Sequence, residues 1–167
     1  NYYRNLLFTS KGIEKFISGI ILFDETFHQS ELETGKKYPE FLSSLGILPG
    51  IKVDQGLVDF GDGEKLTTGL DGLSERLNNY YSLGARFAKW RAVINISETF
   101  PSQDCIEANA DTLAKYALAC QQSNLVPIVE PEVIMDGSHT IDQSFDVTSR
   151  ALSSVFDQLQ NHNVSLQ

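Results

Sequence analysis

The chain has 167 residues, of which 41% are hydrophobic and 21% are charged, and its formal net charge at pH 7 is −9. This composition predicts one globular domain with a sizeable core and gives no sign of disorder. The acidic balance argues against nucleic-acid and anionic-membrane partners, because phosphate-rich surfaces are bound by clustered lysines and arginines.

Apolar, β-branched runs alternate along the chain with amphipathic helical patterns. In chain order, the first half has a predicted strand over 16–23, a short helix over 39–46, a strand over 49–56, a surface loop over 57–69 and a helix from about Asp71 to Gly84. The second half has a predicted strand over 85–96, a long helix after the N-cap Ser102 and a strand over 126–133. A helix opened by the capping box of Thr140 and Gln143 follows, and then a further strand from Val164.

The three longer predicted helices carry apolar residues at helical spacing, and we expect these residues to form the buried face of each. The predicted buried positions are Leu73, Leu77, Tyr80 and Tyr81 in the helix from Asp71, Ile106, Ala110, Leu113, Ala114, Ala117 and Leu118 in the helix after Ser102, and Phe145, Leu152, Val155, Phe156 and Leu159 in the helix after Thr140.

This alternation of strands and helices predicts an α/β fold with a parallel sheet and right-handed crossovers. A doubly wound sheet and a (β/α) barrel both fit the pattern. The first strand is not followed by G-x-G-x-x-G, which weakens the dinucleotide-binding version of the doubly wound sheet. A complete eight-unit barrel takes roughly 250 residues, so 167 residues would supply a partial (β/α)8 TIM barrel.

Three predicted strands each carry two charged residues, two positions apart, near the carboxyl end. The pairs are Lys52 with Asp54, Lys89 with Arg91, and Glu130 with Glu132. Residues two apart share one face of a strand, and barrel active sites lie at the carboxyl ends of the strands. A single such pair is usually a solvated strand end. Three pairs inside apolar runs predict a shared site, because a buried charge without a partner costs several kcal/mol.

The chemistry available to these residues is proton transfer together with anion binding. A glycosidase fits less well, because its two carboxylates flank the substrate whereas Glu130 and Glu132 are neighbours on one strand. The histidines His28, His139 and His162 have no metal-ligand spacing, so we expect surface residues and no metal site.

Cys105 and Cys120 lie in one predicted helix, about 22 Å apart, which is too far for a disulfide between them. We expect reduced thiols and a cytoplasmic protein. The sequence contains no apolar run of transmembrane length and no signal-peptide pattern at its start, so we expect no membrane partner.

Six motifs occur in the same order as in class I fructose-bisphosphate aldolases, and the chain resembles that family over essentially its whole length. The motifs are ILFDET (21–26), GIKVD (50–54), GLDGLSER (69–76), FAKWR (87–91), ACQQ (119–122) and VPIVEPE (126–132). The resemblance implies a (β/α) barrel that reversibly cleaves fructose bisphosphate into dihydroxyacetone phosphate and glyceraldehyde phosphate. It also implies a lysine Schiff base, no metal and no cofactor.

The resemblance implies a role for each charged residue. The catalytic residues would be Glu130 as general acid–base residue, Lys89 in proton handling and substrate contact, and Glu132 as the carboxylate that sets the charge around the lysines. The substrate-binding residues would be Lys52 as a cation, Asp54 as its supporting carboxylate, and Arg91 lining the site.

The resemblance also indicates what residues 1–167 lack. The family's first strand, with its active-site aspartate, would precede Asn1, and the Schiff-base lysine and later strands would follow Gln167. We therefore expect 1–167 to be a single domain, the central part of a barrel, and inactive in isolation. The partner would be a phosphorylated sugar, and the full-length parent would be a homo-oligomer. The alternatives are a non-catalytic aldolase-like binding or scaffold protein and, less favoured, another barrel lyase acting on a phosphorylated sugar.

Overall fold

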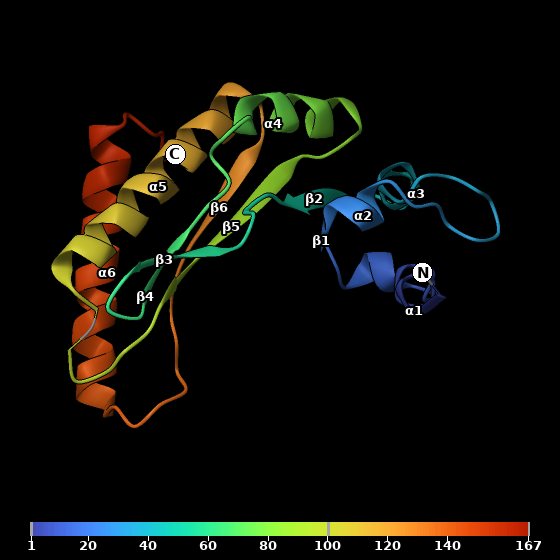
Figure 1. The fold of residues 1–167 in the computed structure, drawn as a ribbon. Coiled ribbons are helices and arrows are strands. Elements are labelled where there is room, and N and C mark those ends of the chain that lie inside the picture. Colours follow the sequence, from blue (N-terminus) through green and yellow to red (C-terminus); the bar gives the residue numbers. More distant parts are fainter. Residues whose placement is uncertain (1, 100, 167) are drawn as a thin grey trace.

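The computed structural model describes residues 2–99 and 101–166. Its centre is a four-stranded sheet of order β1-β2-β5-β6, in which all neighbouring strands run parallel. The strands are β1 (Gly19–Leu22), β2 (Leu48–Lys52), β5 (Phe87–Ile94) and β6 (Val126–Val133). Helices connect and cover these strands, and α5 and α6 lie side by side (Figure 1). The α/β class with a parallel sheet is confirmed.

The helices of the described residues include three long amphipathic elements and several short ones. The bounds are α1 (Tyr2–Phe8), the 3₁₀ turn η1 (Ile13–Lys15), α2 (Asp24–Phe27), α3 (Tyr38–Ser44), α4 (Leu73–Ser82), α5 (Gln103–Gln122) and α6 (Ile141–Asn161). Ser102 caps α5 by accepting the Cys105 N–H, and Thr140 and Gln143 form the predicted capping box of α6. Within 2–99 and 101–166, no helix combines the length and the hydrophobicity that a membrane span needs.

The predicted loop over 57–69 is wrong, because most of it forms an antiparallel hairpin. Its strands are β3 (Leu57–Gly61) and β4 (Glu64–Thr67). The connecting residues Asp62 and Gly63 both have positive φ, at 50° and 91°. This is the conformation that a two-residue hairpin turn of the Asp-Gly type requires.

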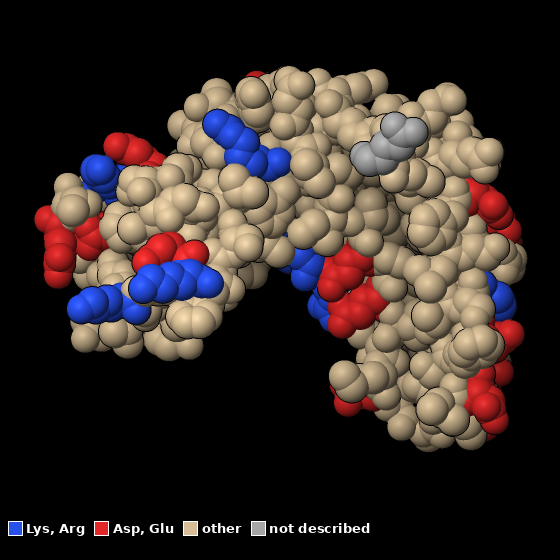
Figure 2. All heavy atoms as spheres, turned by 180° about the vertical axis from the view of Figure 1, so that it is seen from behind, with Lys and Arg blue, Asp and Glu red and all other residues tan. Residues whose placement is uncertain are grey.

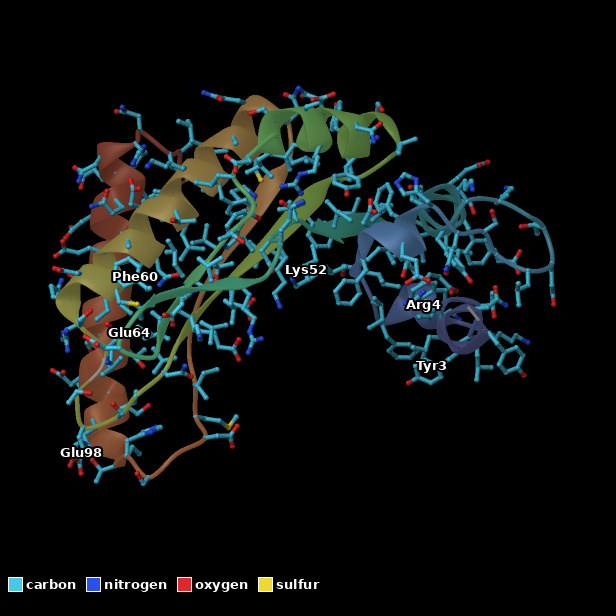
Figure 3. The ribbon with its side chains drawn as sticks, in the orientation of Figure 1. Tyr3, Arg4, Lys52, Phe60, Glu64 and Glu98 are labelled. Atoms are coloured by element: carbon cyan, nitrogen blue, oxygen red, sulfur yellow. The ribbon has the colours of Figure 1, made fainter. Side chains whose placement is uncertain are left out.

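A buried carboxylate fastens this hairpin to α5. Glu64 is 8% exposed, and its two oxygens accept hydrogen bonds from the backbone N–H and the hydroxyl of Ser102, at 2.7 and 2.6 Å. Figure 3 shows Phe60 and Glu64 on the hairpin, beside α5. The hairpin is therefore a fixed part of the fold and closes over the start of that helix.

Three observed strands, β1, β2 and β5, are shorter than predicted, while β6 has the predicted bounds 126–133. The predicted strand over 49–56 ends at Lys52 because Gln55 leaves the sheet and donates its N–H to the Thr68 carbonyl, at 2.8 Å. Residues 164–166 are not in a strand.

The core lies between the sheet and the helices, and β5 shows how the sequence divides its two faces. Ala88, Trp90 and Ala92 are fully buried, whereas Lys89 and Arg91 are partly exposed on the opposite face. The Trp90 ring packs on Tyr116 of α5, with ring centroids 5.3 Å apart. The prediction that residues two apart share a face is confirmed in this strand.

The predicted buried face of α6 is wrong at three of its five positions. Val155 and Leu159 are each 5% exposed, but Phe145, Leu152 and Phe156 are 75%, 42% and 56% exposed. Leu152 and Phe156, together with helix-side residues of β6 such as Val129, line a groove of about 680 Å³. The apolar stripe is wider than the surface that α5 and β6 cover. In α4, Tyr81 is likewise 39% exposed.

Replacing Gly50 with Ala is expected to destabilise the fold by about 1–3 kcal/mol, the usual cost of overpacking. A Cβ at Gly50 would lie 2.3 Å from two ring atoms of Phe87, well inside van der Waals contact. Urea unfolding measures the loss, and adding Phe87→Leu to the same chain should recover part of it. Unchanged stability of Gly50→Ala would contradict this packing.

Candidate functional site

The three predicted charged pairs lie on one face of the sheet, opposite the helices. The parallel register places Lys52 of β2 beside Lys89 of β5, and Arg91 of β5 beside Glu130 of β6. Figure 2 shows acidic and basic side chains gathered in the hollow of the molecule, and Figure 3 shows Lys52 on the concave side of the molecule. The strands therefore bring the predicted residues together at their carboxyl ends.

Lys89 and Glu130 form the contact in this site that is best suited to proton transfer. The Lys89 Nζ lies 2.8 Å from the Glu130 Oε2, and the two side chains are 26% and 32% exposed. An amine and a carboxyl group at this distance can share or exchange a proton. The Glu130 Oε2 itself is buried, while the rest of both side chains is partly exposed in the hollow.

The other two pairs surround this contact. Arg91 donates its Nε–H to Glu132, and Lys52 forms an ion pair with Asp54. The Asp54 side chain is only 6% exposed and also accepts the Arg91 backbone N–H, at 3.4 Å. Asp54 thereby links β2 to β5.

The ion pairs follow a regular offset across the strands. Lys89 is in register with Ile128 and Arg91 with Glu130, yet each cation pairs with the carboxylate two residues further along β6. Each of the three cations already has a carboxylate partner. The site is thus close to electrically balanced, and a phosphate that binds here must compete with a carboxylate for each cation it contacts.

One aromatic residue that the charge pattern did not predict lies beside the site. The Lys52 Nζ lies 5.9 Å from the centre of the Phe23 ring, within the range of a cation–π contact. Phe23 follows β1 directly, so the fourth strand also contributes to this face. Its only sequence signal is its position inside the ILFDET motif.

The remaining titratable residues give no competing site. Groups of three or more His, Cys, Asp or Glu side chains that could hold a metal are absent from the residues the structure describes. His28 is exposed as expected, whereas His139 and His162 are partly buried, and the His162 Nε2 lies 2.9 Å from Asp111.

Both cysteines are buried and unpaired with each other, as expected of reduced core thiols. Burial raises the pKa of Cys105 to about 11 and the pKa of Cys120 to about 12, so neither is a thiolate near neutral pH. The charged face therefore remains the main chemical candidate in the described chain.

The family model for glycolytic fructose-bisphosphate aldolase class I matches residues 1–167. The chain belongs to the class I fructose-bisphosphate aldolase family. This confirms the resemblance that the six motifs indicate.

Individual members of the aldolase family agree with this assignment. The chain is 54% identical to a probable class 1 fructose-bisphosphate aldolase of Xanthomonas axonopodis pv. citri, over 99% of this chain and 50% of that protein. It is 50% identical to the cytosolic fructose-bisphosphate aldolase 4 of Arabidopsis thaliana, over 98% of this chain and 42% of the relative.

A solved aldolase structure has nearly the same fold over these residues. The fructose-bisphosphate aldolase of Plasmodium falciparum, crystallised with TRAP and a small-molecule inhibitor, superimposes with a TM-score of 0.93 at 51% identity. The match covers 98% of this chain and 48% of that one. The chain thus spans about half the length of the aldolases it matches.

Proposed function

We propose that residues 1–167 form the central part of a single (β/α)8 barrel domain of a class I fructose-bisphosphate aldolase, without the barrel's first strand and its later strands. The open parallel sheet, the family assignment and the roughly half-length match to relatives support this proposal.

The reaction is the reversible aldol cleavage of fructose bisphosphate into dihydroxyacetone phosphate and glyceraldehyde phosphate. A lysine outside residues 1–167 forms an imine with the substrate carbonyl and releases water. The carbon–carbon bond then breaks and its electron pair is taken up by the protonated imine, which becomes an enamine, while the hydroxyl on the carbon that becomes the aldehyde gives its proton to a base. Glu130 is that base, and the 2.8 Å contact with Lys89 carries the assignment. Protonation of the enamine carbon and hydrolysis of the imine by water then release dihydroxyacetone phosphate and restore the lysine.

The other charged residues bind and orient the substrate. Lys52 and Arg91 hold phosphate oxygens, Lys52 as a point charge and Arg91 through its planar fork. Asp54 and Glu132 keep these two cations in place when the site is empty, as the ion pairs indicate. A bound phosphate takes over part of that role.

The partner is a phosphorylated sugar rather than nucleic acid or a membrane, and the cellular location is the cytoplasm, as for the plant relatives named cytosolic or cytoplasmic. The full-length protein, meaning the complete reading frame that contains residues 1–167, is a homo-oligomer.

The test compares the full-length protein with residues 1–167 alone. We expect the full-length protein to cleave fructose bisphosphate, and residues 1–167 to show no cleavage. Dihydroxyacetone phosphate with borohydride should leave the mass of residues 1–167 unchanged, because the imine-forming lysine lies elsewhere. A stable adduct on any lysine of 1–167, or a stop codon directly after Gln167, would overturn the proposal. An inactive full-length protein would favour the non-catalytic aldolase-like alternative.

A further inference from the structure

Arg76 belongs to the GLDGLSER motif, and its side chain reaches from α4 to the end of β2. Its guanidinium group donates one hydrogen bond to the Val53 carbonyl, at 3.0 Å, and a second to the Gly69 carbonyl. Val53 stands between Lys52 and Asp54, the ion pair of the candidate site. Arg76 is itself partly buried and is not one of the six residues that the charge pattern predicts.

The two carbonyl groups belong to segments that pack closely beside the site. The Gln55 N–H donates to the Thr68 carbonyl at 2.8 Å, which joins the end of β2 to the exit of the β3–β4 hairpin. A Cβ at Gly69 would lie 3.0 Å from the Gln55 nitrogen and 3.2 Å from the Trp90 ring, so a side chain has no room there. Arg76, on α4, donates a hydrogen bond to each of the two segments that meet at this junction.

The backbone at this junction determines where two site residues point. The Val53 N–H donates to the Lys89 carbonyl at 3.1 Å, so one peptide segment is held by β5 on one side and by Arg76 on the other. Lys52 and Asp54 flank that segment. A lysine ammonium sits on a long flexible stem, and its position depends on a fixed backbone and a fixed partner. A displacement of about 1 Å at such a site can cost about 100-fold in rate.

We propose that Arg76 is a positioning residue for the substrate site: by binding the Val53 and Gly69 carbonyls together, it holds the Lys52–Asp54 pair toward Lys89. The inference rests on the proposed function for its kinetic consequence, but the positioning itself is a property of the fold. A guanidinium fork suits this task because it donates to two separate carbonyls at once, while a lysine at the same place concentrates its donors at one point.

Arg86 provides a matched control. It donates to the Ala85 carbonyl at 2.7 Å and to the Tyr81 carbonyl at 3.4 Å, so it also binds two backbone carbonyls next to α4. It lies just before β5, at the amino end of the strand, whereas the charged site lies at the carboxyl ends.

The experiment measures steady-state cleavage of fructose bisphosphate and thermal unfolding for Arg76→Gln, Arg76→Lys and Arg86→Gln in the full-length protein. Arg76→Gln should raise KM by about 10- to 100-fold, with a smaller change in kcat, because substrate binding through Lys52 is weakened. Arg76→Lys should recover part of the loss. Arg86→Gln should leave both constants unchanged.

A double-mutant cycle with Lys52→Met separates positioning from general destabilisation. If Arg76 acts through Lys52, Arg76→Gln should raise KM no further once Lys52 has been replaced. Equal effects of Arg76→Gln in the two backgrounds would overturn the inference, as would a lowered melting temperature with an unchanged KM.

A second readout does not depend on activity. Acetic anhydride labelling, followed by peptide mass spectrometry, reports how freely the Lys52 amine reacts. Arg76→Gln should speed the labelling of Lys52 several-fold and leave exposed lysines such as Lys15 unchanged, while Arg86→Gln should change neither. If the wild-type protein cleaves no fructose bisphosphate, the proposed function fails and the labelling alone decides the positioning role. Unchanged labelling of Lys52 in Arg76→Gln would overturn that role.

Discussion

Glu130→Gln in the full-length protein is expected to lower kcat for fructose bisphosphate cleavage by about 10²- to 10⁴-fold, the usual contribution of a positioned acid–base group. Glutamine keeps the shape of the side chain but cannot accept and return a proton. It also removes the carboxylate that lies 2.8 Å from the Lys89 ammonium. KM should change much less than kcat, because Lys52 and Arg91 remain to bind phosphate.

Glu107→Gln is the control for this prediction. Glu107 is an exposed residue of α5 that accepts a hydrogen bond from Gln103 at 2.9 Å. Its replacement should leave kcat and KM unchanged. A Glu130→Gln enzyme with wild-type kcat would show that another group transfers the proton, and the role assigned to Glu130 would have to be abandoned.

Trp90→Ala is expected to destabilise the fold by about 3–5 kcal/mol, the range found when a large buried aromatic residue is truncated. Trp90 is fully buried on the helix side of β5, and its ring packs on Tyr116 of α5. Its neighbours in the sequence, Lys89 and Arg91, point to the opposite face. The replacement therefore loosens the strand that presents two of the site cations.

Denaturant unfolding of the full-length protein measures this loss, and Phe16→Ala is the matched control. Phe16 is 84% exposed, so its truncation should change the free energy of unfolding by no more than about 0.5 kcal/mol. Similar small losses for Trp90→Ala and Phe16→Ala would mean that Trp90 does not pack in the core as described.

The periodicity of the strands explains why the charged face could be predicted from the sequence. Lys89 and Arg91 alternate with Ala88 and Trp90, and a strand with one face against helices must turn the charged members to the other face. The pairing within the site could not be predicted in the same way. Whether Lys89 meets Glu130 or Glu132 depends on the register of β5 against β6, which local sequence does not determine.

The hairpin and α6 show two further limits of local patterns. Asp62 and Gly63 are as typical of a loop as of a hairpin turn, and this segment is shown to belong to the fold by tertiary contacts such as those of Glu64 with Ser102 and of Thr67 with the Arg91 carbonyl. The apolar stripe of α6 predicts a face that is able to be buried. Phe156 is nevertheless 56% exposed, because α5 and β6 cover only part of that stripe.

Arg76 escaped prediction for a related reason. It lies on a helix, three residues after Leu73, and neither helical spacing nor charge distinguishes it from a solvated surface residue. Its role depends on two backbone carbonyls outside its helix, at Val53 and Gly69, which only the folded chain brings beside its guanidinium group.

In the proposed site, Lys52, Lys89, Arg91 and Glu130 meet around one substrate, and a crystal structure of the full-length protein with a hexitol 1,6-bisphosphate tests this directly. That ligand carries both phosphates but has no carbonyl group, so it binds without forming an imine. We expect it in the hollow of the sheet, with Lys52 and Arg91 on phosphate oxygens and with Lys89 and Glu130 beside its carbon chain. A bisphosphate bound away from these four side chains would contradict the account.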